Sequence, residues 1–164
     1  MPPADEAIPQ PAQQLDAWLH DRAAFFEAWR EETGSLQGWD FSEESLDILE
    51  TLVRERFSED VEVRTAKTSS FVQGAVWYVG ETVRRNRAAS WMFNPRHLAP
   101  AGPAPALFEG TRGQQDTPSM SGSVRGGGDG GIYPLGALVE LFWEEDDAGE
   151  RIEPRLRDIL DCFD

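Results

Sequence analysis

Apolar side chains near the N-terminus recur every three or four residues, which is the period of an α-helix. The positions that carry this pattern are Leu15, Trp18, Leu19, Phe25, Phe26 and Trp29, with Arg22 filling the one gap in the spacing. Aspartate and glutamate side chains occupy much of the opposite face. Gly34 follows the last turn, at a place where glycine is favoured as a C-terminal cap. The pattern therefore predicts an amphipathic helix over residues 12–32.

A second amphipathic segment has stronger start signals. Ser42 can accept a hydrogen bond from a first-turn N–H, and the acidic residues after it suit the positive end of the helix dipole. Phe41 and Leu46 have the spacing of a hydrophobic staple. We predict a helix over residues 43–57, with an apolar face formed by Leu46, Leu49, Leu52, Val53 and Phe57.

The most apolar segment predicts a third helix, over residues 69–86. It contains Gly74 and Gly80, and each costs up to about 1 kcal/mol relative to alanine in a helix interior. Glycine in a helix often lets a bulky ring or another backbone approach closely. Apolar spacing at Leu135, Leu138, Val139 and Phe142 predicts a fourth helix over residues 135–144. A last helix is predicted from Pro154 onwards, because proline is favoured at the first helical position.

Strand signals are shorter. Residues 61–64 alternate apolar and polar side chains like a half-buried strand, and residues 91–93 and 107–109 are short apolar candidates. Nine of the fifteen glycines and six of the eleven prolines lie in residues 94–134. Because structureless segments of this length are usually functional or disordered, we predict a mobile loop over residues 110–131.

These elements predict an α+β fold, with about five helices around a small sheet of two to four short strands. The 164 residues suit one domain, which we place at residues 12–164 after a proline-rich flexible tail at residues 1–11. The N-terminus lacks the basic and apolar regions of a signal peptide, and the longest nearly apolar stretch, residues 71–80, is too short to span a membrane. These features predict a cytoplasmic protein.

The net charge of −15 argues against nucleic acid and anionic membranes as partners. The acidity is uneven, because residues 66–98 are net positive. This basic island contains Arg84, Arg85, Arg87, Arg96 and His97. It is consistent with cations at a helix C-terminus, with a site for an anion or a carboxylate, or with a docking site for an acidic segment of the same chain.

Glu81 is the only acidic residue in that island, and it lies in the most apolar helix. Arg84 and Arg85 follow at the three- and four-residue spacing of helical neighbours. A carboxylate in such a helix must be paired or have a raised pKa. The structural interpretation is an ion pair with Arg85 or a hydrogen bond to a neighbouring backbone. The functional interpretation is a polar binding cluster of Tyr78, Glu81, Arg84, Arg85 and Trp91 beneath the mobile loop.

Other chemical motifs are weak. Gly126, Gly128 and Gly131 match a phosphate-binding glycine pattern but lack the required strand and helix around them. His20, His97 and Cys162 have no metal-ligand spacing, so we predict neither a metal nor a cofactor. A run of four acidic residues is a second candidate binding site; it consists of Glu144, Glu145, Asp146 and Asp147. This acidic run is either a solvated turn or a surface for a basic partner.

The segment Tyr78-Val79-Gly80-Glu81, with Arg84-Arg85 and Trp91, resembles a helix-plus-tryptophan signature in small proteins of high-GC bacteria. The Ser42 helix start and the later Tyr133-Pro134 helix entry are similar too, so the resemblance covers residues 40–163 loosely. Some proteins of this size and layout act as immunity or accessory proteins. The resemblance implies no catalytic residue.

The leading functional prediction is a non-enzymatic, acidic protein-interaction module, such as an immunity or accessory protein, that binds a basic surface on another protein. One alternative is a small enzyme or ligand-binding protein that uses Tyr78, Glu81 and Arg85 under the mobile loop. Another is an assembly or scaffold subunit, which would expose a large apolar patch.

Overall fold

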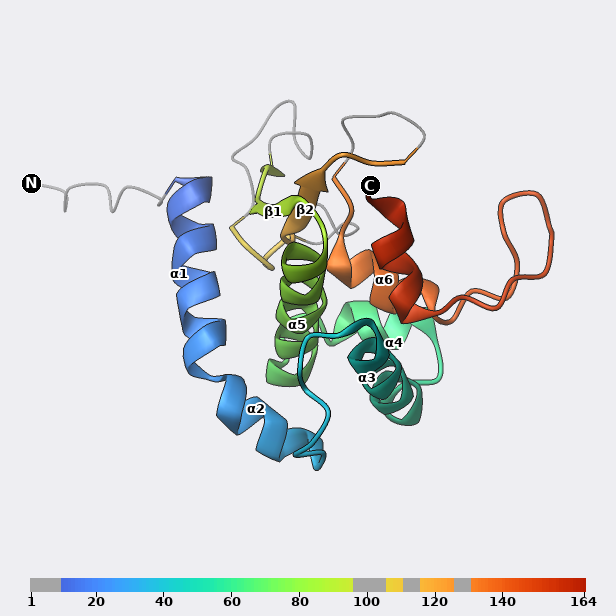
Figure 1. Ribbon diagram of the computed structural model, residues 1–164, viewed down its shortest axis with the longest axis horizontal. Coiled ribbons are helices and arrows are strands. Elements are labelled where there is room, and N and C mark those ends of the chain that lie inside the picture. Colours follow the sequence, from blue (N-terminus) through green and yellow to red (C-terminus); the bar gives the residue numbers. More distant parts are fainter. Residues whose placement is uncertain (1–9, 96–105, 111–115, 126–130) are drawn as a thin grey trace, which may run out of the picture.

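The computed structural model describes residues 10–95, 106–110, 116–125 and 131–164 (Figure 1). Within these residues it contains six α-helices, one 3-10 helix and a two-stranded antiparallel sheet, so the predicted α+β class is confirmed. The elements are α1 (Pro11–Ala24), α2 (Phe26–Thr33), α3 (Glu43–Arg56), α4 (Asp60–Thr65), α5 (Ser70–Asn86), β1 (Ala89–Met92), β2 (Ser119–Gly122), α6 (Pro134–Glu140) and η2 (Leu156–Cys162). No helix in the described ranges combines the length and apolarity needed to cross a bilayer.

Helix α5 is the centre of the fold, and α1, α2, α3 and α6 surround it (Figure 1). It begins where predicted, because the Ser69 hydroxyl accepts a hydrogen bond from the Val72 N–H at 3.3 Å. A Cβ atom at Gly74 would overlap the Trp29 ring, and one at Gly80 would overlap the Trp91 ring. Both glycines are therefore needed for close packing of tryptophan against the helix.

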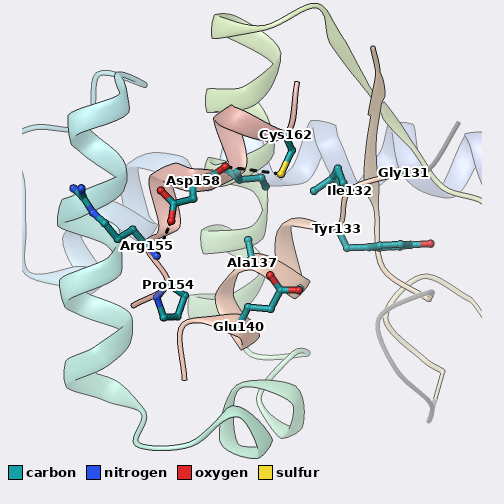
Figure 2. Close-up of a pocket in the computed structure, with 11 residues that line it drawn as sticks. Gly131, Ile132, Tyr133, Ala137, Glu140, Pro154, Arg155, Asp158 and Cys162 are labelled. Atoms are coloured by element: carbon teal, nitrogen blue, oxygen red, sulfur yellow. Dashed lines mark hydrogen bonds between the residues drawn. The ribbon is translucent and has the colours of Figure 1, made fainter. Parts of the chain in front are cut away.

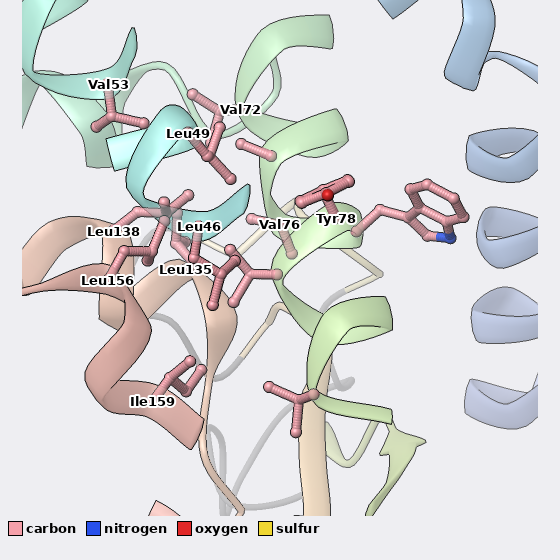
Figure 3. Close-up of a cluster of buried hydrophobic side chains, with 14 of the residues drawn as sticks. Leu46, Leu49, Val53, Val72, Val76, Tyr78, Leu135, Leu138, Leu156 and Ile159 are labelled. Atoms are coloured by element: carbon pink, nitrogen blue, oxygen red, sulfur yellow. The ribbon is translucent and has the colours of Figure 1, made fainter. Parts of the chain in front are cut away.

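The main core lies between α3, α5, α6 and η2 (Figure 3). Helix α3 begins at the predicted cap, where the Ser42 hydroxyl accepts a hydrogen bond from the Ser45 N–H at 3.2 Å. Its apolar face buries Leu46 and Leu49 completely. Burial of each such side chain contributes roughly 1.5–3 kcal/mol, so this interface is a large part of the stability of the fold.

The predicted helix over residues 12–32 is present as two helices, because the backbone changes direction at Phe25. Helix α2 ends at Thr33 and is capped by Gly34, as predicted, and Gly34 adopts a left-handed conformation with φ of 76°. The indole N–H of Trp29 donates a hydrogen bond to the carbonyl oxygen of Phe71 at 3.1 Å. This bond and the packing at Gly74 fix α2 against α5.

Two strand predictions are wrong. Residues 61–64 lie in helix α4, which buries Val63 and exposes Val61, so a four-residue alternation described one turn of a helix equally well. Residues 107–109 form a turn in which Phe108 has φ of 64°. The buried Phe108 ring packs on Trp18 with centroids 5.4 Å apart, so tertiary packing overrides its strand propensity.

The small sheet pairs β1 with β2 and sets Trp91 opposite Met120. The predicted strand at residues 91–93 thus begins two residues earlier and ends at Met92. Strand β2 falls within residues 110–131, where we predicted a loop. Residues 111–115 and 126–130 of that segment lie outside the described residues, as do residues 1–9 of the predicted tail.

A buried ion pair attaches the turn after β1 to the helical body. The Nζ atom of Lys67, the only lysine of the chain, donates to Asp116 Oδ2 at 2.6 Å and to the carbonyl oxygen of Gly110 at 2.5 Å. The Asp116 side chain is fully buried and that of Lys67 is 14% exposed. The Asp116 main-chain carbonyl also accepts a hydrogen bond from the Phe108 N–H at 2.8 Å. The pair therefore holds residues 106–110 and 116–119 together.

The two C-terminal helices are shorter than predicted. Helix α6 ends at Glu140, and the last helix is the 3-10 helix η2, which begins two residues after Pro154. Between them the chain forms a hairpin, residues 143–153, that projects away from the helical body (Figure 1).

Candidate functional site

Glu81 lies at the centre of the cluster predicted from sequence. Its side chain is 9% exposed. The Oε1 atom accepts a hydrogen bond from the Trp91 indole N–H at 2.9 Å, and Oε2 pairs with Arg84 Nη2 at 2.7 Å and with Arg85 Nε at 3.5 Å. The structure therefore brings four of the five predicted residues of this cluster together.

The surroundings of Glu81 set its ionisation. Burial acts to raise the pKa of Glu81, but the hydrogen bonds from Arg84 and Trp91 and the charges of Arg84 and Arg85 outweigh it and lower the pKa. Both carboxylate oxygens already accept bonds from protein donors. The carboxylate is thus ionised, and it connects the end of α5 to β1.

Tyr78 is separate from this cluster. Its buried hydroxyl accepts a hydrogen bond from the Phe41 N–H at 2.9 Å and donates one to Ser45 Oγ at 2.7 Å. Burial raises the pKa of Tyr78, although its hydrogen bonds with Ser45 and Phe41 partly oppose this effect. The Phe41 ring stacks on Tyr78 at 4.8 Å, so Tyr78 fixes the entry of α3 rather than approaching Glu81.

The basic island is largely engaged within the protein. The guanidinium of Arg85 lies 3.7 Å from the centre of the Phe41 ring, a cation–π contact. The Arg87 Nε donates to the carbonyl oxygen of Leu160 at 3.0 Å, which attaches η2 to α5. Arg96 and His97 lie outside the described residues.

The acidic run forms the outer part of the hairpin at residues 143–153, which we call the acidic hairpin. Its turn is ordered by Asp146, whose Oδ1 accepts bonds from the Ala148 N–H at 2.9 Å and the Glu150 N–H at 2.8 Å. Residues 143–151 are all exposed. Among the described residues, no ion pair involves the side chains of Glu144, Glu145 or Asp147.

Arg54 of α3 holds both ends of the acidic hairpin. Its Nη1 donates to the carbonyl oxygen of Leu141 at 2.9 Å, and its Nη2 donates to that of Pro154 at 2.8 Å. A cavity of about 440 Å³ lies at this base, lined in part by Ile152 and by Trp143, which is 39% exposed. The hairpin thus places an aromatic surface beside its carboxylates.

A second cavity, of about 400 Å³, lies between α6 and η2 (Figure 2). Its apolar lining includes Ile132, Ala137, Pro154 and Ile159, and its polar lining includes Tyr133, Glu140, Asp158 and Cys162. The sequence pattern did not predict this pocket, because its residues come from three segments without a shared motif. The only signal was Pro134 at the start of α6, which positions Tyr133 and Glu140.

Three groups in this pocket have raised pKa values, and burial is the cause for Tyr133. Partial burial raises the pKa of Glu140, although the residue is exposed to solvent at the pocket. Burial, and then the charges of Glu140, Asp161 and Asp158, raise the pKa of the Cys162 thiol. A protonated thiol is a poor nucleophile, so these surroundings do not activate Cys162. No group of three or more His, Cys, Asp or Glu side chains in the described ranges is arranged to hold a metal ion.

Comparison with known proteins gives no relative. No protein-family model, curated protein or solved structure matches the chain. The resemblance to proteins of high-GC bacteria therefore stays a prediction.

Proposed function

We propose that the protein is a cytoplasmic, non-enzymatic interaction module, of the immunity or accessory kind, that binds a basic surface of another protein through its acidic hairpin. The observation that supports this proposal is the exposed, ordered hairpin at residues 143–153, whose outer carboxylates have no cationic partner among the described residues. The sequence between Trp143 and Pro154 contains six carboxylates and one arginine.

Electrostatics and shape both favour this use of the hairpin. A dense negative patch accelerates encounter with a positive surface and disfavours acidic partners. Trp143 at the base adds an amphipathic ring of the type that is enriched at interaction hot spots. Because Asp146 orders the turn before binding, little conformational entropy is lost when a partner docks.

The alternative of a ligand site at Glu81 is less well supported. A ligand that bound the Glu81 carboxylate would have to displace Trp91, Arg84 or Arg85, all of which already satisfy it. The Tyr78 hydroxyl is used by Ser45 and Phe41. These contacts favour a structural role for the cluster.

The experiment that tests the proposal compares two charge variants in capture from a cell extract of the native host. One variant neutralises the hairpin with Glu144→Gln, Glu145→Gln and Asp147→Asn, and retains Asp146 because it orders the turn. The control variant makes the same change in net charge at exposed sites elsewhere, with Glu31→Gln, Glu55→Gln and Glu59→Gln.

We expect the wild-type protein and the control variant to capture the same basic protein, and the hairpin variant to lose it. Capture should also weaken as salt is raised, because exposed charges are screened beyond about 8 Å at physiological ionic strength. Equal capture by both variants would contradict a role for the hairpin.

A further inference from the structure

A groove with an apolar lining lies at the base of the acidic hairpin. It is the cavity of about 440 Å³ described above, which we call the base groove, and its apolar lining consists of Leu141, Trp143, Ile152 and Pro154. Trp143 is 39% exposed, and tryptophan is enriched among the residues that dominate binding at protein interfaces. Because Arg54 holds the carbonyl groups of Leu141 and Pro154, the groove is formed before any partner binds.

The arginine side chains that line the base groove are engaged within the fold. Arg54 donates through Nε to Glu50 Oε2 at 3.2 Å, in addition to its bonds with the two carbonyl groups. Glu50 Oε1 in turn accepts a hydrogen bond from the Leu156 N–H at 2.7 Å. Arg155 Nη2 lies 3.5 Å from Asp47 Oδ1 on α3. The charged groups Arg54, Glu50 and Arg155 are therefore already paired when a partner arrives.

Two other carboxylates line the base groove, one from each side of the hairpin. The Ile152 N–H donates to the Glu144 carbonyl oxygen at 3.0 Å, and Glu153 is the next residue toward the base. Both glutamates are exposed, and within the described residues no ion pair involves either side chain. Arg151, the one arginine between Trp143 and Pro154, does not line the groove. The groove therefore presents an aromatic ring and negative charge to a partner.

These surfaces match the side chain of arginine. A guanidinium group is planar, so it can stack on an indole ring while its N–H groups make paired hydrogen bonds to a carboxylate. A lysine ammonium group is a compact, strongly hydrated charge that lacks this geometry. The methylene groups of either side chain can contact Ile152 and Pro154, so the head group decides the preference.

We propose that the base groove binds an arginine side chain of the partner protein, with its guanidinium group on Trp143 and paired with Glu144 or Glu153. This inference rests on the proposed function and adds the kind of residue that anchors the partner. A second copy of this chain is not the expected occupant, because its net charge of −15 opposes association with the acidic hairpin.

The first test follows the indole N–H signal of Trp143 in ¹⁵N-labelled full-length protein, identified by its loss in Trp143→Phe. The probe is Nα-acetyl-arginine methylamide, and the controls are the corresponding lysine compound and the citrulline compound, a neutral analogue of similar shape. We expect a saturable shift with a dissociation constant on the order of 10 mM for the arginine compound. The two control compounds should bind at least about threefold more weakly.

Matched variants locate the binding. The double variant Glu144→Gln and Glu153→Gln should bind the arginine compound at least about threefold more weakly than the wild type. The double variant Glu31→Gln and Glu55→Gln, with the same change in net charge at exposed sites elsewhere, should bind it as the wild type does. The proposal is overturned if the arginine compound gives no saturable shift up to about 50 mM, or if the citrulline compound binds equally well.

Trp143→Leu separates this proposal from the proposed function, because it keeps every charge of the hairpin. In capture from the host extract, we expect Trp143→Leu to lose the basic partner, as the hairpin charge variant does. Full capture by Trp143→Leu together with loss in the charge variant would overturn the arginine anchor and leave the proposed function standing. Full capture by both variants would contradict the proposed function, and with it a partner arginine in the groove.

Discussion

Loss of the Lys67–Asp116 ion pair should be among the most destabilising single changes on this protein. The charges lie 2.6 Å apart, and Asp116 is fully buried. At an effective dielectric constant near 20, two unit charges at this separation attract by about 6 kcal/mol, and desolvation offsets part of this energy. Breaking such a pair leaves one buried charge without a partner, at a cost of about 3–5 kcal/mol.

The perturbation is a double-mutant cycle of Lys67→Met and Asp116→Asn. Each single variant should lose about 3–5 kcal/mol in the free energy of unfolding, measured by urea denaturation. For a domain of this size, the melting temperature should fall by about 6–20 °C. The double variant removes both charges, so its loss should be smaller than the sum of the single losses by about 2–3 kcal/mol.

The control is the exposed pair of Arg64 and Asp60 on α4, which are 3.5 Å apart with side chains 51% and 37% exposed. Its removal should change stability by no more than about 1 kcal/mol, because exposed pairs are well screened. Additive losses below about 1 kcal/mol at Lys67 and Asp116 would refute the reasoning and show that the pair is not desolvated.

Three further predictions concern α5 and η2. Gly80→Ala should destabilise the fold by about 1–3 kcal/mol in urea denaturation, because the new methyl group overlaps the Trp91 ring. This loss is expected although alanine has a better helix propensity than glycine. Unchanged or increased stability would contradict the packing of Trp91 on Gly80. Since the pKa of Glu81 is lowered in the folded state, its contribution to stability is present above its unfolded-state pKa and is lost as pH falls through its folded-state pKa. When the free energy of unfolding is measured on acidification, Glu81→Gln should therefore lose less stability than the wild type. Equal losses would disprove the link between Glu81 ionisation and stability. The raised pKa of Cys162 predicts that its alkylation rate rises with a midpoint above the value of about 8.5 for a free thiol; a midpoint below that value would show an activated cysteine.

Local signals predicted the starts of α3 and α5 well, whereas α4 was predicted as a strand. Ser42 and Ser69 cap α3 and α5 as their positions next to long apolar patterns suggest. Glycine in an apolar helix indicates the close approach of a ring or a backbone, and the structure shows that the group at Gly80 is the Trp91 ring. The Glu81–Arg84 contact follows from helical spacing alone.

Contacts between distant segments could not be predicted in this way. Lys67 and Asp116 are 49 residues apart, and neither lies in a motif. Phe108 looks like a strand residue, but the Trp18 surface binds it in a turn. Tyr78 precedes Glu81 by three residues, yet its hydroxyl is captured by Ser45 on α3. In each case the contact or the backbone conformation depends on tertiary packing, which local sequence preferences do not determine.

The most direct test of the interaction proposal is photo-crosslinking in the native host, with p-benzoylphenylalanine in place of Glu145 on the acidic hairpin. A matched variant has the same residue in place of Glu55, an exposed position on α3. The proposal predicts one adduct with a basic protein from position 145 and none with that protein from position 55. No adduct at position 145, or the same adduct from both positions, would contradict it.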